Sequence, residues 1–168
     1  METAPDLCAL LTRKETVTKD TKIEVPAVEG FFTVEEESHL IGGRFKKSGN
    51  YCFPKNLGGS DPGFPEDEIE EVLLSRVGKI WSYTNSAYPP PPPFIAAEPY
   101  EPIVIAAVEL EQEKMVILGQ VVNGYSVDDL SVGMRVEVTV GTLYEDSEYR
   151  YLTWMWSPLP EEEKQGKN

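Results

Sequence analysis

Two apolar runs decide the fold of this chain: IVIAAVEL at residues 103–110 and MVILGQVV at residues 115–122. Short continuous runs of this kind, rich in valine and isoleucine, are typical of buried strands. Gly119 interrupts the second run, and a glycine inside a strand pattern predicts a bulge or a sharp bend. We interpret the two runs as strands in the middle of an all-β region.

Three further strand patterns surround these runs. Residues 80–83 are rich in aromatic and aliphatic side chains, residues 135–140 alternate polar side chains with valine, and residues 149–156 (YRYLTWMW) are expected to form the last strand. A period of two is the pattern of a half-buried strand. Residues 126–134 fit a short helix or turn that enters the fourth strand. Five short strands within about 80 residues predict a five-stranded barrel of the OB type over residues 77–158.

The chain before the barrel begins with a segment of mixed pattern, residues 1–40. Pro5 precedes a stripe of apolar residues at helical spacing, and Thr33 followed by Glu36 fits a capping box at the start of a second helix. Residues 16–28 are rich in threonine, valine and charge, which favours an extended conformation. We expect a helical and extended N-terminal segment.

Residues 41–76 are irregular and rich in glycine and proline, which mark turns. A small hairpin is expected around Ser48 and Gly49, because short aromatic stretches flank this turn on both sides. At the other end of the chain, residues 159–168 are expected to form a disordered acidic tail.

The composition excludes several classes of function. The chain has 168 residues with 15 Lys and Arg against 29 Asp and Glu, a net charge of −14. This balance disfavours nucleic acids and anionic membranes as partners, since both are bound by basic side chains. No apolar run is long enough to span a bilayer, the N-terminus lacks the basic region of a secretory signal, and two distant cysteines make no disulfide framework. We expect a cytoplasmic protein.

The catalytic inventory is poor. His39 is the single histidine and lies in a polar stretch typical of a surface residue, while Cys8 and Cys52 lie in apolar surroundings typical of small buried side chains. No nucleophile elbow, phosphate-binding loop, dinucleotide fingerprint or zinc-protease motif is present. We predict no catalytic residue in this chain, and the residues alone favour a binding or accessory protein over a self-sufficient enzyme.

Two surface segments are candidate contact sites. The only basic stretch is at residues 41–60, where Arg44, Lys46, Lys47 and Lys55 occur without an acid. This stretch fits a solvated hairpin, or alternatively a contact with phosphates or a partner. The second segment is YPPPPPF, in which five prolines favour a stiff polyproline II rod. We interpret it as a strap over the barrel or a partner contact, formed by Tyr88, Pro89, Pro90, Pro91, Pro92, Pro93 and Phe94.

Over roughly residues 30–158, the order and spacing of several stretches resemble a known family. It is the family of acyl-CoA-associated proteins built from N-terminal helices, a rubredoxin-like zinc ribbon and a C-terminal OB-fold. The stretches are LIGGRFKKSGNYCFP (40–54), IEEVLLSRVGKIWSYT (69–84), YPPPPPF (88–94), EPIVIAAVEL (101–110), LGQVV (118–122) and VGM (132–134).

The sequence departs from this family at the zinc ribbon. Phe45 and Ser48 stand where the first cysteine pair is expected, and no cysteine stands near Gly59 and Phe64, where the second is expected. Structural zinc needs four ligands, which Cys52 alone cannot supply. The resemblance therefore implies a degenerate ribbon over residues 41–76 without zinc or any other metal, in which Phe45 and Phe64 pack together instead.

The resemblance implies a small non-catalytic subunit that partners a thiolase-superfamily enzyme, either a thiolase, an aldolase or an acyl transferase. The partner would carry the catalytic cysteine and histidine, and the two subunits would share a coenzyme A thioester of lipid, steroid or aromatic metabolism. The basic residues 44, 46, 47 and 55 would then contact coenzyme A or the partner. Two alternatives are a nucleic-acid module that uses Trp81, Tyr83, Trp154 and Trp156 as platforms, and a stand-alone acyl-CoA hydrolase.

Overall fold

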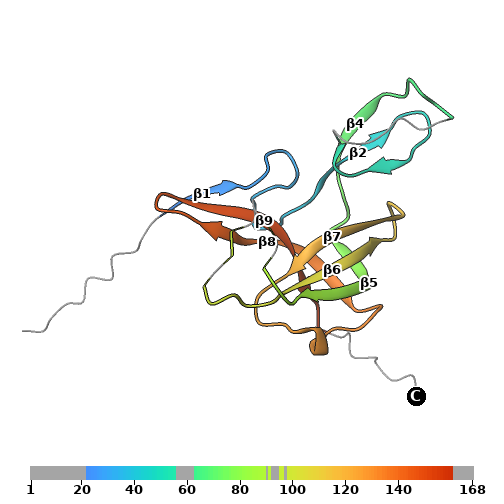
Figure 1. Cartoon of the computed structure of the whole chain (residues 1–168). Helices are drawn as coiled ribbons and strands as arrows, with labels where there is room; N and C mark the ends of the chain where they lie inside the picture. The colour runs from blue at the N-terminus through green and yellow to red at the C-terminus, as the bar shows by residue number, and fades with distance from the viewer. Residues whose placement is uncertain (1–21, 56–62, 90, 92–94, 97, 161–168) are drawn as a thin grey trace, which may run out of the picture.

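The computed structural model describes residues 22–55, 63–89, 91, 95–96 and 98–160. Its strands form a six-stranded and a three-stranded sheet (Figure 1). No α-helix occurs among the described residues, and none of them forms a helix that could cross a membrane.

The larger sheet closes into a five-stranded barrel, which confirms the predicted OB-fold. The strands follow in the order β9-β7-β6-β5-β8, and β8 pairs back onto β9. A 3-10 turn, Val127–Asp129, lies between β7 and β8, where a short helix or turn was expected. The strands are β5 (Val77–Ser86), β6 (Ile103–Leu110), β7 (Met115–Val121), β8 (Arg135–Glu145) and β9 (Tyr149–Pro158).

The barrel core follows from the alternation of side chains along its strands. On β6 every second residue is buried, so Val104, Ala106, Val108 and Leu110 face inward. Trp156 on β9 is completely buried. The β6–β7 pairing is regular through Gly119, so of the bulge or bend predicted there, the bulge is wrong. A Cβ at Gly119 would lie 2.7 Å from Trp156 Nε1, so the glycine makes room for an indole ring.

The smaller sheet, called the ribbon below, lies within residues 41–76, where a degenerate ribbon was expected, and has the strand order β3-β2-β4. It contains β2 (Ile41–Phe45), β3 (Tyr51–Cys52) and β4 (Ile69–Leu73), and it stands away from the barrel in Figure 1. The hairpin around Ser48 and Gly49 is confirmed, because Arg44 pairs with Tyr51 across it. Gly49 has a positive φ of 74°, a conformation that glycine adopts without strain.

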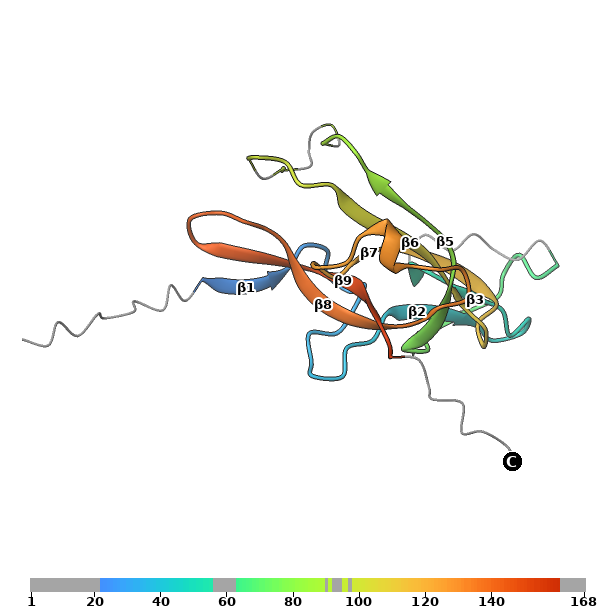
Figure 2. The ribbon, with the colours of Figure 1, turned by 90° about the horizontal axis from the view of Figure 1, so that it is seen from below.

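The N-terminal segment is extended where it is described. Strand β1 (Ile23–Pro26) lies parallel to β9, beside the part of the β8–β9 hairpin that projects from the barrel (Figure 2). The helix expected at Thr33 and Glu36 is wrong. The Thr33 hydroxyl accepts the N–H of His39 instead, in a loop closed by the Phe32–Leu40 bridge. The helix expected after Pro5, and Cys8, lie outside the described residues.

Glu113 joins the ribbon to the barrel. Its Oε1 accepts hydrogen bonds from the backbone N–H and the hydroxyl of Ser75, in the link between β4 and β5, at 2.8 and 2.9 Å. Arg76 in the same link donates to the carbonyl oxygen of Ser38. Leu40 and Leu74 are buried in one cluster with the barrel core. The two sheets are therefore held together by both apolar packing and polar contacts.

Candidate functional site

An apolar groove of about 510 Å³ lies where the ribbon meets the barrel. One wall comes from β3 and the residues after it, and the other comes from β7 and β9. Nearly all of its side chains are apolar or aromatic, which is typical of a site that accepts an apolar group. It is lined by Phe31, Tyr51, Cys52, Phe53, Pro54, Met115, Val116, Ile117, Leu118 and Trp154.

Three aromatic rings form the floor of this groove. The centroids of Phe31 and Phe53 are 5.8 Å apart, and Phe53 meets Trp154 edge to face at 5.7 Å. Such edge-to-face contacts are favourable because the ring edge is positive and the ring face negative. The Trp154 indole is fixed further, since its Nε1 donates to the carbonyl oxygen of Leu118 at 3.0 Å. The aromatic floor of the groove is therefore preformed.

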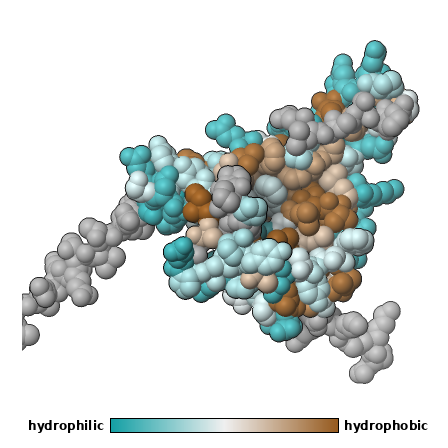
Figure 3. Space-filling view, in the orientation of Figure 1, coloured by the Kyte–Doolittle hydropathy of each residue, from teal (hydrophilic) through white to brown (hydrophobic). Residues whose placement is uncertain are grey.

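The groove opens onto an apolar face on the outside of the barrel, defined here as Trp81, Ile105, Ala107, Val116 and Leu118. Trp81 is 62% exposed, Val116 47% and Leu118 64%. Leu118 lies opposite Ala107, which lies opposite Ser82, the residue after Trp81. Figure 3 shows hydrophobic residues gathered over β6 and β7.

Sequence reasoning missed this apolar face, although a signal was present. A strand with one solvated face normally alternates apolar and polar residues. The first four residues of β7, MVIL, do not alternate, so apolar side chains appear on both faces of the strand. The run was expected to be a buried strand, whereas its outer side is exposed at Val116 and Leu118.

The four predicted basic residues all lie on the ribbon, and acids at positions 68, 70 and 71 accompany three of them. Lys46 Nζ lies 2.8 Å from a carboxylate oxygen of Glu68, and Arg44 lies 3.9 Å from Glu70. Lys55 forms an ion pair with Glu71. Three of the four basic side chains are thus paired with acids, so the basic stretch is not a free cationic patch.

Lys47 takes part in a different contact, through its backbone. The Asp67 carboxylate accepts the N–H groups of Lys47 and Ser48, with N to O distances of 2.9 to 3.0 Å. Desolvation raises the pKa of Asp67, but the two N–H groups and the positive charge of Lys47 outweigh it. The pKa of Asp67 therefore lies below the usual value, and its carboxylate fixes the turn where the first cysteine pair was expected.

The described donor set does not fit a zinc site. Phe45 is buried and has no metal-binding atom, and no group of three His, Cys, Asp or Glu among the described residues could hold a metal. Phe45 pairs with Ile69 across the strands and Phe64 is 45% exposed, and the packing of Phe45 against Phe64 stays a prediction. Gly59 lies outside the described residues.

The proline segment is only partly described. Tyr88 is 76% exposed, and Pro89 and Pro91 are also exposed. The Tyr100 hydroxyl donates to the carbonyl oxygen of Ser86. This hydrogen bond joins the chain before the proline segment to the chain after it. The other members of the predicted contact, Pro90, Pro92, Pro93 and Phe94, lie outside the described residues.

His39 and Cys52 each contact a backbone group in the structure. His39 Nδ1 lies 2.9 Å from the carbonyl oxygen of Glu37. Desolvation raises the pKa of the Cys52 thiol, and a hydrogen bond with the backbone of Gly43 offsets this only in part. A nucleophilic cysteine needs the opposite shift, because the thiolate is the reactive form.

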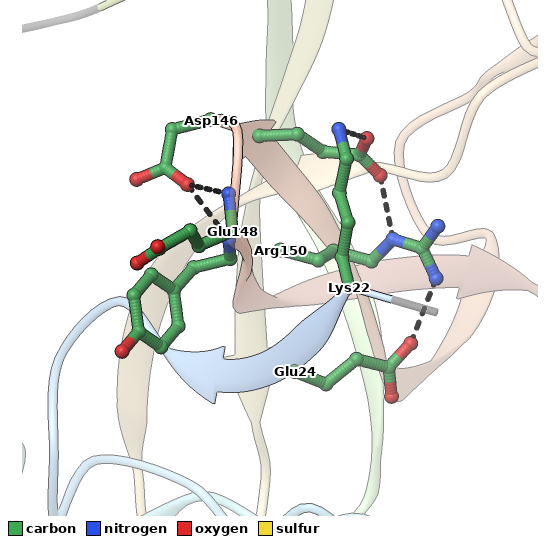
Figure 4. Close-up of polar contacts among 7 residues, drawn as sticks. Lys22, Glu24, Asp146, Glu148 and Arg150 are labelled. Carbon is green, nitrogen blue, oxygen red and sulfur yellow. Dashed lines mark hydrogen bonds and ion pairs between the residues drawn. The ribbon is translucent and has the colours of Figure 1, made fainter. Parts of the chain in front are cut away.

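A charged network at the projecting end of the β8–β9 hairpin was not predicted (Figure 4). Arg150 bridges Glu145 and Glu24 at 2.6 and 2.9 Å, and Lys22 pairs with Glu145 at 2.7 Å. Hydrogen bonds from Lys22 and Arg150 lower the pKa of Glu145. All members pair with one another, so we assign the network to the attachment of β1.

Comparison with known proteins finds a family model and a solved structure that are similar to this chain. Residues 71–141 match the family model described as "ChsH2, C-terminal OB-fold domain". A solved structure described as "Ltp2-ChsH2(DUF35) aldolase" superimposes with a TM-score of 0.55 at 22% sequence identity. This match covers 71% of this chain and 84% of the other, and at such identity it shows a common fold.

Proposed function

We propose that this chain, whose residues 71–141 match the family model of the ChsH2 C-terminal OB-fold domain, is an accessory subunit of a thiolase-like acyl-CoA enzyme. The family match carries the proposal. A related structure is described as an aldolase of two named components, Ltp2 and ChsH2. The partner subunit would supply the catalytic residues, and this chain would supply contact surface.

The surroundings of His39 and Cys52 support a non-catalytic role. Cys52 has a raised pKa, and the one hydrogen-bond distance of the His39 ring is to a backbone oxygen. The exposed groove and apolar face support a role in binding, because such surfaces on a strongly acidic chain are costly unless something covers them. We therefore place the bond-making chemistry of the complex in the partner.

The ribbon is the proposed contact for coenzyme A or for the partner, through residues Arg44, Lys46, Lys47 and Lys55. Arg44 and Lys47 are the best candidates of the four. The Arg44 pair with Glu70 is long at 3.9 Å, and the Lys47 side chain is exposed. Lys46 and Lys55 would first have to leave Glu68 and Glu71. Tyr88 and the prolines after it are the second proposed partner contact.

Co-purification tests this function directly. The full chain, expressed in its native host with an affinity tag, is expected to retain a thiolase-superfamily protein that mass spectrometry identifies. The isolated chain is expected to turn over no acyl-CoA, and the complex is expected to do so. Turnover by the isolated chain, or a solitary monomer beside the candidate enzyme, would refute the proposal.

Two further measurements address its details. Replacing Arg44, Lys46, Lys47 and Lys55 with alanine is expected to weaken the complex or raise its KM for acyl-CoA. If neither the affinity nor the KM changes, the proposed contact through the ribbon is wrong. We also propose that the ribbon holds no zinc. Metal analysis of the purified full chain is expected to find none, and about one zinc per chain would contradict this.

A further inference from the structure

We propose that the apolar face and the groove beside it are one docking surface for a protein partner, which places an apolar side chain in the groove and basic side chains around it. This inference rests on the proposed function, because the partner is taken to be the thiolase-like subunit. It goes further by naming which side of the barrel meets the partner and by which chemistry.

The first step is that the exposed side chains are contiguous. Neighbouring strands lie about 4.8 Å apart, so the run from Trp81 through Ala107 to Leu118 extends roughly 10 Å across β5, β6 and β7. Trp81 and Leu118 are each more than half exposed. Large exposed side chains gathered on one face mark an interaction site, whereas scattered ones do not.

The second step is that the surface includes a hollow. Val116 and Leu118 belong to both the apolar face and the groove, and the groove continues to the rings of Phe53 and Trp154. The side chains that dominate protein interfaces are aromatic or large apolar groups seated in such hollows. The groove volume of about 510 Å³ is ample for one such side chain of the partner.

The third step is the charge around the apolar face. This charge decides which kind of partner can bind there. Glu109 lies opposite Val116 on the outer side of the sheet, and Lys79 is already paired with Glu111 at 2.6 Å. A second copy of this chain would also carry a net charge of −14, so the two copies would repel each other. Glu109 would then face an acidic surface. Nucleic acid would meet the same repulsion. A different protein with lysine or arginine near an apolar centre is complementary.

The test changes the middle of the surface without changing the core. Leu118→Arg and Leu118→Glu both alter a side chain that is 64% exposed and points away from the barrel interior. Val132→Arg is the matched control, since Val132 is 69% exposed in the turn before β8 and lies outside the docking surface. Circular dichroism and denaturant midpoints check that each variant folds.

Binding is measured by calorimetry between the full chain and the thiolase-superfamily protein identified by co-purification. Because a central interface residue typically changes affinity by about tenfold or more, Kd is expected to rise at least that much for both Leu118 variants. The rise is expected to be greater for arginine, since the partner's surface is basic. Val132→Arg is expected to bind as the unchanged chain does.

The outcomes separate this inference from the proposed function. If no thiolase-superfamily protein binds the unchanged chain, both are wrong. If it binds and the folded Leu118 variants bind equally well, only the docking surface is wrong. Sedimentation is measured in parallel, and a dimer of the unchanged chain that Leu118→Arg dissociates would assign the face to a second copy and overturn the inference.

Discussion

The ribbon and the barrel lie side by side but are stabilised in different ways. The barrel has an apolar interior in which Trp156, Val108 and Val136 are fully buried. The ribbon has short strands of two to five residues, and its contacts include the ion pairs of Lys46, Lys55 and Arg44 with acids at positions 68–71. Surface ion pairs contribute little each, so the ribbon depends on its neighbours more than the barrel does.

This difference follows from what each segment can bury. A three-stranded sheet of this size needs a packed apolar face to be stable. The ribbon obtains part of one from Leu40 and Leu74, which lie in the same cluster as the barrel core, and from Glu113, which binds the link to the barrel. The comparison predicts that barrel substitutions destabilise the whole molecule and that ribbon substitutions act locally.

The largest effect is expected at the centre of the barrel. Trp156→Ala removes a fully buried indole and leaves a cavity, which typically costs about 3–5 kcal/mol of unfolding free energy. Urea unfolding followed by circular dichroism measures the loss. Val132→Ala, at a 69% exposed position, is the control and is expected to change the unfolding free energy by less than about 0.5 kcal/mol. Equal effects at the two positions would contradict the assignment of the core.

The second-largest effect on stability is expected at Glu113, which joins the ribbon to the barrel. Two substitutions of this residue separate the effect of its contact with Ser75 from the effect of its buried charge. Glu113 is 94% buried (6% exposed), and its Oε2 has no hydrogen-bond partner. Glu113→Ala leaves the Ser75 N–H and hydroxyl without their acceptor, which typically costs about 1–3 kcal/mol for buried groups. Glu113→Gln keeps one acceptor oxygen for Ser75 and removes the buried charge, so we expect little loss of stability.

The same urea unfolding measurement compares the two variants. If glutamine destabilises as much as alanine, the charge of Glu113 matters rather than its contact with Ser75. In that case the unpartnered Oε2 would have to be satisfied in solution by a donor such as a buried water molecule.

The sequence predicts the barrel well because its signals are local. Residues 135–140 show their alternation directly, and the structure confirms a strand there. The role of Gly119 was missed because Trp156, the ring that it accommodates, lies far along the chain. Strand β1 was missed as a partner of β9, since a four-residue strand carries almost no pattern of its own.

The site was harder to predict than the fold. The basic residues were found, but their neutralisation was not, because Glu68, Glu70 and Glu71 reach them only through the pairing of β2 with β4. Pairing over such a separation is set by tertiary structure and not by local pattern. The groove likewise combines residues from opposite ends of the chain, such as Phe31 and Trp154.

A smaller and local effect is expected at Asp67, which binds the turn of the ribbon. Asp67→Asn weakens the acceptor for the N–H groups of Lys47 and Ser48, so these two amides are expected to exchange with solvent several-fold faster in NMR measurements. Barrel amides are expected to be unchanged. Faster exchange throughout the molecule would contradict a local role.

Acid is expected to have the same effect as this substitution. The pKa of Asp67 is lower in the folded chain than the value of about 3.9 for an unfolded aspartate. The ionised form is therefore favoured by folding, and its contribution is present above the unfolded pKa and lost as the pH falls through the folded pKa. We expect the ribbon amides to lose protection below about pH 4, and the Asp67→Asn variant to lack this step.

The smallest effect is expected for a single ion pair on the ribbon surface. Lys55→Ala removes the pair with Glu71, whose carboxylate side chain is 57% exposed, and such pairs typically contribute less than about 1 kcal/mol. The unfolding free energy is expected to change within that limit, and the change is expected to vanish in 1 M salt because salt screens exposed charges. Glu71→Ala is the matched variant and is expected to have the same effect as Lys55→Ala. A loss as large as that of Trp156→Ala would mean that electrostatics stabilise the ribbon as strongly as burial stabilises the barrel, and the contrast between the two regions would be wrong.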